Sequence, residues 1–416
     1  TPAGVVFGGE LSETIEDALG RLEQKPRTIV QVGGTPSANV LDWSALLRGA
    51  DVQLPEVSGE HVLYLGYTSG TTGKPKGVIV THEQVCTGAS VAAQAYNLGF
   101  YGVNIMTGSL SFLSTVISHN LSHVYCNSAV VLIGEFDVAK QVAKIEQYGG
   151  TFTYALTPAI PAFTEALSRS PKALETLQNI NIGSSPIPAQ IKKDLVAVTG
   201  NRAVGVYGLT ESMGAPLFAG RQRDWDAEED GYELVGRIAP PAVIRIVDED
   251  GNDLPWDGEQ VGEIWAATPA MMSGYWNNDE ATAATIEDGW LRTGDLGSIS
   301  PNGYLKVRGR LKDLIVSGGM NIYPAEIETV LQRDPAVVEV AVVGAPDEKW
   351  GETPVVFVQF VENQLPAEPS EYVLGICRRE LASFKRPSRV YVLETFPRNP
   401  AGKVLKTELR QTAEAS

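Results

Sequence analysis

The chain has 416 residues, of which 43% are hydrophobic and 20% are charged, a composition ordinary for a globular protein of two or three domains. Its net charge of −17 argues against a nucleic-acid partner, because such binding depends on neutralising phosphates. No apolar stretch approaches the roughly 18 residues that a membrane span needs, and residues 1–15 lack a signal-peptide pattern. Cys86, Cys126 and Cys377 form no metal or redox motif, so we expect buried cysteines and a cytoplasmic location.

The first half of the chain alternates β-branched runs with helical patterns, the βαβ rhythm of a parallel sheet. We expect buried strands at 62–67, 129–133 and 152–155, a further strand at 202–206, and helices at 12–24, 83–95 and 137–148. Shorter alternating runs at 243–247, 262–266 and 304–307 indicate a β-rich subdomain. Helices at 325–332 and 371–383 with strands at 337–343 and 355–360 indicate a small α+β domain.

These patterns predict an α/β fold in two parts. Residues 1–311 form a large N-terminal domain of parallel α/β sheets plus the β-rich subdomain. Residues 312–416 form a small α+β C-terminal domain, joined to the first by a hinge.

A loop rich in glycine, hydroxyl groups and lysine follows the expected strand at 62–67. Its glycines allow backbone N–H groups to converge on an anion, while the hydroxyls and lysines add donors and charge. The residues concerned are Thr68, Ser69, Gly70, Thr71, Thr72, Gly73, Lys74 and Lys76. Pro75 follows Lys74, so the loop is not a Walker A motif. The alternative is a flexible surface loop.

The stretch 67–77 resembles the signature loop of the adenylate-forming superfamily, which includes acyl- and aryl-CoA ligases, peptide-synthetase adenylation domains and firefly luciferase. Five further motifs follow in the family's order and span roughly the rest of the chain. Gly183, Ser184, Ser185 and Pro186 resemble the adenine-binding turn, although such a cluster alone is usually just a turn.

The next motifs complete the expected nucleotide site. Tyr207 and Gly208 resemble the segment that presents an aromatic face to adenine, and Thr210 offers a hydroxyl to the α-phosphate. Glu211 offers a hard oxygen ligand to Mg²⁺. The resemblance further implies ribose contacts from two residues, Asp295 and Arg310.

The last motifs lie around the expected hinge. By resemblance Lys312 is the pivot, and Ser317, Gly318 and Gly319 belong to the loop of the coenzyme A tunnel. Lys403 corresponds to the catalytic lysine that bridges the substrate carboxylate and the α-phosphate; with Thr210 and Glu211 it forms the expected catalytic set.

The family implies activation of a carboxylic acid as acyl-AMP and transfer to coenzyme A, with ATP and Mg²⁺. Two alternatives stay open: loading of a separate carrier protein, and an inactive relative that acts as a binding subunit. Phe112 and Met213 are candidates for the acyl pocket, and an uncharged tail is expected because the usual ammonium-binding Asp is not apparent at 110–115. His119 is interpreted as a residue on a helix face.

The start of the chain departs from the family. Relatives carry roughly a hundred residues before the position of Thr1, so we expect a second polypeptide or a member with a reduced N-terminus. Self-association as a homodimer is a further possibility that the sequence leaves open.

Overall fold

The computed structural model describes residues 4–37, 39–46, 55–68, 75–110, 112–134, 136–183, 186–228, 231–362, 364–398 and 404–414. The chain divides into two compact units, Thr1–Ser58 and Gly59–Ser416. The domain boundary predicted between residues 311 and 312 lies inside the second unit and stays a prediction. Among the described residues, no helix is both long enough and apolar enough to cross a membrane.

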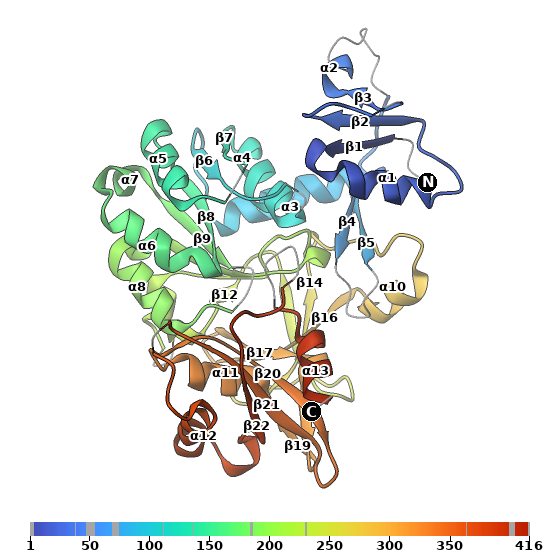
Figure 1. The fold of residues 1–416 in the computed structure, drawn as a ribbon. Coiled ribbons are helices and arrows are strands. Elements are labelled where there is room, and N and C mark those ends of the chain that lie inside the picture. The colour runs from blue at the N-terminus through green and yellow to red at the C-terminus, as the bar shows by residue number, and fades with distance from the viewer. Residues whose placement is uncertain are drawn as a thin grey trace. The chain divides into compact units, whose positions relative to one another are not determined.

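The first unit is a small parallel sheet with two helices (Figure 1). Its elements are β1 (Gly4–Gly8), α1 (Ser12–Gly20), β2 (Thr28–Val32), β3 (Leu41–Asp42) and α2 (Trp43–Leu46). Strands β1 and β2 pair in parallel, as do β2 and β3, which confirms the predicted βαβ rhythm. Val30 is buried, whereas Val6 and Val32 are exposed within this unit.

A seven-stranded sheet forms the centre of the second unit, in the order β12-β11-β10-β9-β8-β6-β7. Its strands are β6 (Val103–Met106), β7 (Ala129–Leu132), β8 (Phe152–Leu156), β9 (Asn179–Gly183), β10 (Ala203–Tyr207), β11 (Phe218–Gly220) and β12 (Arg237–Ile238). The strands from β7 to β10 pair in parallel, whereas β11 and β12 are antiparallel. The carboxyl ends of β8, β9 and β10 therefore meet at one edge.

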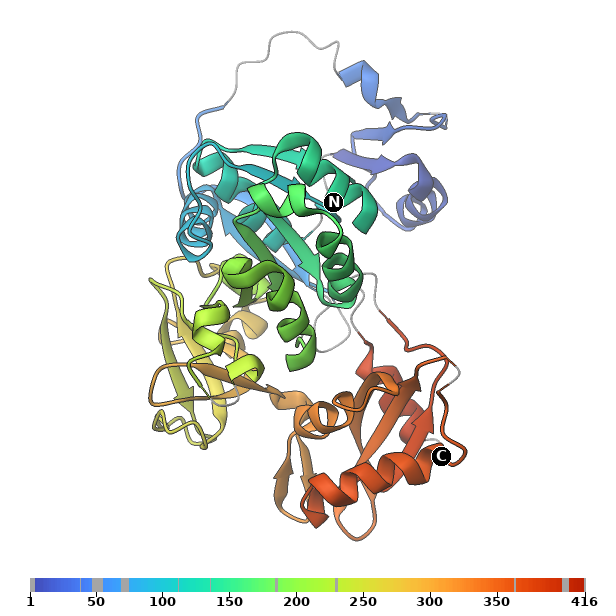
Figure 2. The same cartoon turned by 90° about the vertical axis from the view of Figure 1, so that its left-hand side faces the viewer.

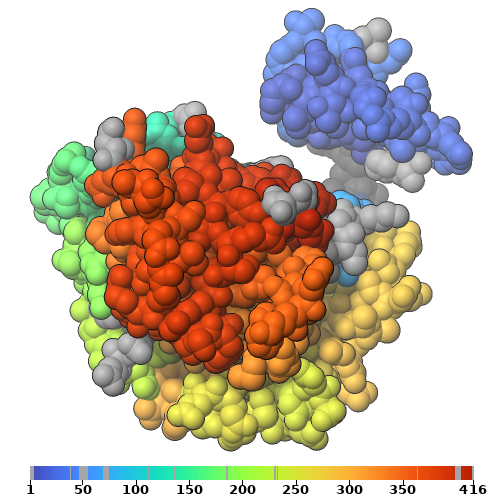
Figure 3. All heavy atoms as spheres, turned by 60° about the horizontal axis from the view of Figure 1, so that its bottom comes forward, coloured from blue at the N-terminus to red at the C-terminus, as the bar shows by residue number. Residues whose placement is uncertain are grey.

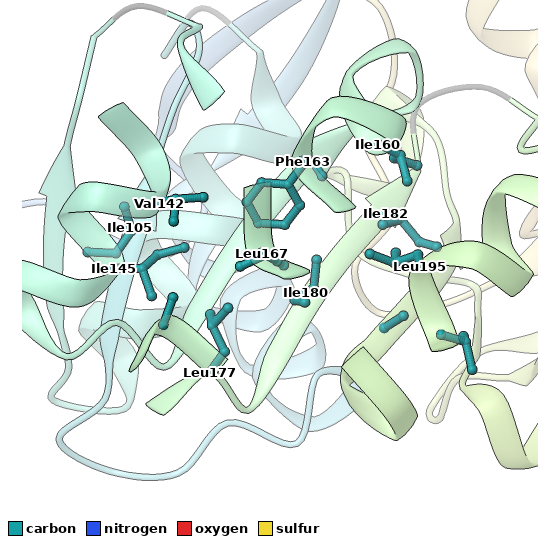
Figure 4. Packing of buried hydrophobic residues seen from close by; sticks show 14 of the residues in the cluster. Ile105, Val142, Ile145, Ile160, Phe163, Leu167, Leu177, Ile180, Ile182 and Leu195 are labelled. Atoms are coloured by element: carbon teal, nitrogen blue, oxygen red, sulfur yellow. The ribbon is translucent and has the colours of Figure 1, made fainter. Parts of the chain in front are cut away.

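Helices cover both faces of this sheet. One face carries α5 (Val138–Tyr148), α6 (Ile160–Ser168), α7 (Pro171–Thr176) and α8 (Ala189–Thr199), which pack over a core of Ile105, Phe163, Ile180 and Ile182 (Figure 4). The other carries α3 (His82–Ala95), the π-helix η2 (Ser114–Leu121) and α4 (Ser122–Tyr125).

Local sequence sets the ends of these helices. Thr81 and Gln84 form a capping box at the start of α3, in which each side chain bonds the other residue's backbone N–H. Asp137 caps α5 through a bond from the Lys140 N–H, and Gly149 ends that helix at φ 63°.

Three predictions of burial are wrong. Strand β4 (Val62–Thr68) pairs antiparallel with β5 (Lys76–Thr81) and is exposed at Val62, Leu63 and Tyr67, because the two strands form a separate sheet of their own and, among the described strands, β4 has one neighbour only. Strand β7 is exposed at Ala129 and Leu132 because it lies at the edge of the large sheet. Cys86 is exposed on α3, whereas Cys126 and Cys377 are buried.

The β-rich region predicted from residue 243 is a five-stranded sheet. It contains β13 (Val243–Val247), β14 (Gly262–Ala267), β15 (Ile286–Glu287), β16 (Trp290–Ile299) and β17 (Leu305–Arg310), with α10 (Asp279–Thr285) beside it. Its core includes Ile246, Ile264 and Leu305.

The C-terminal region is a second mixed sheet with three helices (Figure 2). Its elements are β18 (Ile315–Ser317), β19 (Met320–Ile322), α11 (Pro324–Gln332), β20 (Val337–Asp347), β21 (Gly351–Phe360), α12 (Pro369–Glu380), β22 (Arg389–Val392) and α13 (Lys406–Glu414). Pro324 starts α11 at its first position, as predicted. In Figure 3 these residues, orange to red, form one continuous body.

Candidate active site

Three of the predicted nucleotide-binding residues meet at the carboxyl end of β10. The Tyr207 hydroxyl donates to Asp295 Oδ2 at 2.7 Å, and Arg310 Nε lies 2.7 Å from Asp295 Oδ1. Asp295 is only 5% exposed, and Thr293 Oγ1 accepts its backbone N–H. Burial, followed by the charge of Asp295, raises the pKa of Tyr207, so its phenol remains a donor.

These residues come from β10 and from the hairpin of β16 and β17, which lies about 90 residues further along the sequence. Register pairing places Asp295 opposite Arg310 across the β16–β17 hairpin. Tyr207 is the last residue of β10, and its ring makes an edge contact with Phe218. The hydroxyl bond to Asp295 was not anticipated from the sequence, which predicted only an aromatic face.

A second group gathers around Glu211. The Tyr275 hydroxyl donates to Glu211 Oε1 at 2.7 Å, and Lys76 Nζ lies 4.9 Å from the centre of the Tyr275 ring. The backbone adds to this link, since Met272 N–H donates to the Glu211 carbonyl and Trp276 N–H to the Gly77 carbonyl. Burial, followed by Glu211, raises the pKa of Tyr275, which therefore stays protonated.

The donor set around Glu211 suits Mg²⁺. This ion commonly binds through one or two carboxylates together with substrate phosphates and water. The described residues contain no cluster of three or more His, Cys, Asp or Glu side chains able to hold a metal by themselves. Glu211 is a single half-buried carboxylate that the Tyr275 hydroxyl orients, and Lys76 lies over the same tyrosine ring. This arrangement suits a Mg²⁺ ion that arrives bound to a nucleotide.

The phosphate loop is described only at its two ends. Thr68 ends β4 and Lys76 starts β5. Ser69, Gly70, Thr71, Thr72, Gly73 and Lys74 lie outside the described residues. In the adenine turn, Gly183 ends β9 and its carbonyl accepts a bond of 3.0 Å from Thr157 Oγ1. Ser184 and Ser185 lie outside the described residues, and Pro186 is exposed.

The predicted pivot and tunnel loop lie close together in the sequence. Lys312 is exposed in the 3-10 turn η7 (Leu311–Asp313), and its carbonyl accepts a bond of 3.3 Å from Arg410 of α13. Ser317 ends β18, and the two glycines form its turn to β19 at φ +56° and +79°. Gly318 N–H donates to the Trp350 carbonyl at 2.7 Å. Lys403 lies outside the described residues.

The two candidates for the acyl pocket differ in environment. Phe112 is 43% exposed, whereas Met213 is fully buried among Val85, Ala89 and Ile117. Met213 adopts φ +58°, and its position ends the short turn that carries Thr210 and Glu211. Their role in the pocket stays a prediction.

Two features of the site were missed in the sequence. Tyr275 has only a weak signal, an aromatic pair after Gly274 in an otherwise irregular segment. The expected helical location of His119 is confirmed, but the ring is buried against Tyr154 at 4.7 Å between centroids. Tertiary contacts of a helix and of an irregular segment bring these residues to their partners, and local sequence patterns do not show such contacts.

Comparison with known proteins places the chain in a family. Residues 3–276 match the AMP-binding enzyme family, and residues 326–403 match the AMP-binding enzyme C-terminal domain. The long-chain-fatty-acid–CoA ligase FadD13 of Mycobacterium tuberculosis is 33% identical over 420 residues, which cover 99% of this chain and 79% of that protein. The indoleacetate–CoA ligase of Aromatoleum aromaticum is 35% identical over 383 residues, covering 90% and 72%.

Structural comparison agrees with the sequence matches. The amide bond synthetase McbA from Marinactinospora thermotolerans superimposes with a TM-score of 0.85 at 27% identity, over 99% of this chain and 80% of that one. The chain belongs to the AMP-binding, adenylate-forming enzyme family, which confirms the resemblance and the fold class. Within that family it is an AMP-forming acid–thiol ligase.

Proposed function

We propose that this enzyme activates a carboxylic acid with an uncharged tail, using MgATP, and transfers the acyl group to coenzyme A. The observation that carries the proposal is the convergence of Tyr207, Asp295 and Arg310 at the carboxyl end of β10. In open α/β sheets ligands bind at this edge. Glu211 and Lys76, linked through Tyr275, supply the metal ligand and the cation that a nucleotide triphosphate needs.

Each residue of the proposed site would have its own role in the first step, the formation of acyl-AMP. Asp295 would accept hydrogen bonds from the ribose hydroxyls, with Arg310 and Tyr207 fixing the carboxylate. Glu211 would hold Mg²⁺, which when bound offsets charge on the phosphates. Thr210 would donate to the α-phosphate. From the resemblance, Lys403 would bridge that phosphate and the substrate carboxylate.

The chemistry needs no protein nucleophile. A carboxylate oxygen attacks the α-phosphorus of ATP in line, the new acyl–phosphate bond forms, and pyrophosphate leaves. The sulfur of the thiol then attacks the acyl carbon, the thioester forms, and AMP leaves with the electron pair of the broken bond. Lysine and oriented donors offset the repulsion between a carboxylate and ATP.

We also propose that residues 1–311 and 312–416 act as a large and a small domain around Lys312. The separate family match to residues 326–403 and the separate core under α11 and α12 support this division. Coenzyme A is favoured as acceptor because FadD13 and the indoleacetate enzyme are both named as CoA ligases. The names of these two relatives give different acids, so the class of acid that this enzyme activates stays open.

The test is acid-dependent pyrophosphate release from MgATP over aromatic and aliphatic acids, with and without coenzyme A. Release that turns over only with coenzyme A, with the acyl-CoA detected by mass spectrometry, is the expected result. Release that stalls at bound acyl-AMP would favour a separate carrier protein as acceptor. Binding of ATP without release for any acid would contradict the proposal and favour the inactive-subunit alternative.

A further inference from the structure

A buried carboxylate that the proposed mechanism does not use lies beside the strand that carries Asp295. Glu263 belongs to β14, the neighbour of β16 in the five-stranded sheet (Figure 1), and it is 8% exposed. Carboxylates are rarely buried unless other groups donate hydrogen bonds to them. The donors around Glu263 therefore indicate why this position carries a charge.

Both oxygens of Glu263 accept hydrogen bonds. The Trp265 indole N–H donates to Oε2 at 2.8 Å, and two nitrogens of Arg292 donate to the same atom at 3.3 Å each. Oε1 accepts the backbone N–H of Gly294 at 3.0 Å. Since every neighbouring group is a donor, the position needs a side chain that accepts at both of its terminal atoms, and a carboxylate meets this need.

The strand β16 bulges at the point where Glu263 faces it. In the register of the two strands Glu263 lies opposite Leu296. The next paired positions are Trp265 and Arg292. Between these two pairs β14 has one residue, whereas β16 has three, residues 293–295. Extra residues of a bulge lose their partners in the ladder, so their backbone N–H groups need acceptors elsewhere.

Two buried side chains supply these acceptors. Glu263 accepts the N–H of Gly294, and Thr293 Oγ1 accepts the N–H of Asp295 at 3.1 Å. The Thr293 hydroxyl in turn donates to the Ile264 carbonyl at 2.7 Å. The bulge is thus tied to β14 at two consecutive N–H groups, which fixes the backbone from which the Asp295 side chain projects.

The backbone of Gly294 has the conformation that this bulge requires. Its φ is +67°, and a Cβ added there would meet no heavy atom within 4 Å. The left-handed conformation is unfavourable for residues with a side chain, so glycine is favoured here for its backbone and not for lack of space. The hydrogen bond from its N–H to Glu263 holds the conformation in place.

A role in the stability of the sheet alone does not account for this arrangement. The Arg292 side chain is 38% exposed and has a second carboxylate partner, Glu287, at 3.2 Å. Ion pairs this close to the surface contribute little to stability. The bond to Gly294 is different, because it is made inside the bulge, one residue before Asp295. Glu263 therefore lies where it can set the position of the Asp295 carboxylate.

We propose that Glu263 is a positioning residue for ribose recognition: its bond to the Gly294 N–H holds the bulge that places the Asp295 carboxylate against the ribose hydroxyls. Arg310 and Tyr207 orient the same carboxylate through its oxygens. This inference rests on the proposed function, in which Asp295 binds the ribose. Binding groups must be held within about 0.5 Å by the residues that support them, so a shift of the bulge weakens the contacts to the hydroxyls.

The test measures the preference for a ribonucleotide over its 2′-deoxy analogue. Calorimetry with the full chain gives the dissociation constants of AMP and 2′-deoxy-AMP. We expect the wild-type protein to prefer AMP on the order of 10-fold, the effect of one hydrogen bond to a charged group. Glu263→Gln should reduce this preference to about twofold or less, because its amide nitrogen would face one of the donors and release the bulge.

The ratio of the two dissociation constants isolates positioning from stability. A loss of folded protein weakens the binding of both nucleotides by the same factor and leaves their ratio unchanged. Glu287→Gln is the matched control, since it removes the other carboxylate of Arg292 and keeps the Gly294 bond. It should keep the wild-type ratio.

A second variant tests the same bond from its other end, should Glu263→Gln fail to fold. In Gly294→Ala the added Cβ meets no atom, but the left-handed backbone is strained. The N–H then turns away from Glu263, and the preference for AMP should fall to the same extent as in Glu263→Gln. Acid-dependent pyrophosphate release, measured as for the proposed function, is followed in parallel.

The outcomes separate this inference from the proposed function. Loss of the AMP preference in Glu263→Gln or Gly294→Ala, with the preference kept in Glu287→Gln, supports the positioning role. A preference that those two variants keep, an equal loss in Glu287→Gln, or equal wild-type affinities for both nucleotides overturns it, while pyrophosphate release still supports the ligase. The expected ratios without pyrophosphate release would support the positioning role and contradict the proposed activity. A wild-type protein that binds neither nucleotide and releases no pyrophosphate overturns both.

Discussion

At the scale of single residues, a tyrosine hydroxyl donates a hydrogen bond to each of the two carboxylates of the proposed nucleotide site. Tyr207 bonds Asp295 and Tyr275 bonds Glu211, each at 2.7 Å. Both tyrosines have a pKa raised first by burial and then by the carboxylate, so both remain donors at neutral pH. The carboxylates are thereby oriented in the free protein, and under the proposed function this would lower the cost of ordering them when a nucleotide binds.

Removing the hydroxyl that orients Glu211 should weaken the response to magnesium. Tyr275→Phe keeps the ring beside Lys76 but loses a hydrogen bond to a charged group, which is worth about 1.5–3 kcal/mol. We expect the Mg²⁺ concentration for half-maximal pyrophosphate exchange to rise on the order of 10-fold. Tyr391→Phe, whose hydroxyl accepts a bond from Arg389 in the C-terminal sheet, is the control. An unchanged Mg²⁺ dependence in Tyr275→Phe would contradict the assigned role.

The buried histidines should make the fold sensitive to acid. Burial lowers the pKa of His119 to about 3 and that of His123 to about 4, from 6.5. The unfolded chain therefore binds more protons as pH falls below 6.5, and the free energy of unfolding drops by about 1.4 kcal/mol per pH unit for each histidine. The free energy of unfolding keeps falling until the pH reaches the folded-state pKa of each histidine, about 4 for His123 and about 3 for His119.

Replacing one histidine should flatten this dependence. His123→Asn keeps a donor for the His119 carbonyl and removes one titrating group, so the difference in unfolding free energy between pH 7.5 and pH 5 should shrink by about 2 kcal/mol. Urea unfolding at both pH values measures it. Thr164→Val, a buried change in α6 on the opposite face of the sheet, should leave the difference at the wild-type value. Equal slopes in His123→Asn and wild type would refute the assignment.

At the scale of elements, the β18–β19 hairpin depends on its glycine turn. Gly318 has φ +56°, and a Cβ there would lie 2.7 Å from the Trp350 ring. A side chain would thus meet backbone strain and would also displace the half-exposed Trp350 ring. The turn can change shape without disturbing the nucleotide residues on β10 and β16.

Gly318→Ala should therefore separate the two half-reactions. We expect pyrophosphate exchange to stay within about threefold of wild type, while thioester formation falls on the order of 10-fold because the thiol is misplaced. Single-turnover acyl transfer to coenzyme A measures the second step. Gly303→Ala is the control, since it has φ +83° but no heavy atom within 4 Å of the added Cβ. A matching loss in exchange would show that the loop serves the first step as well.

At the scale of the whole molecule, the proposed pivot joins two separately cored regions. Lys312 is exposed, and Arg410 bonds both its carbonyl and the Asp313 carboxylate, so α13 is tied to the pivot. Glu233 accepts bonds from Lys306 and from Arg333 of the C-terminal region. If the backbone at Lys312 rotates, each of these contacts must either break or move together with the C-terminal region.

Lys312→Pro tests whether rotation at this residue matters. Proline fixes φ near −65°, so it should impair one half-reaction at least 10-fold more than the other if the two steps need different backbone conformations. Lys312→Ala removes the side chain without restricting φ and serves as the control. Equal losses in exchange and thioester formation would count against the pivot.

Much of the site could be predicted from local sequence. The loop at 67–77, the Tyr207–Glu211 segment and Asp295 each combine turn-forming residues with polar groups after a strand, and such patterns are read within a few residues. The helices were predictable for the same reason, as the capping box at Thr81 and the proline at position 324 show. Burial of β4 and β7 was predicted wrongly, because apolar runs do not reveal whether a strand is central or at an edge.

The sequence by itself determined the family and the α/β fold class, and it predicted candidate nucleotide-binding residues, since motif chemistry and chain periodicity are local properties. Only the tertiary structure decided which hydroxyl orients each carboxylate and which polar side chains share a buried site. Tyr275 lies 64 residues from Glu211, and Asn181 lies 62 residues from His119. Backbone contacts of the segment around Tyr275 with β5 and with Glu211 bring the first pair together, and packing of η2 on the sheet brings His119 to the face that carries Asn181. No pattern within a short window carries that information.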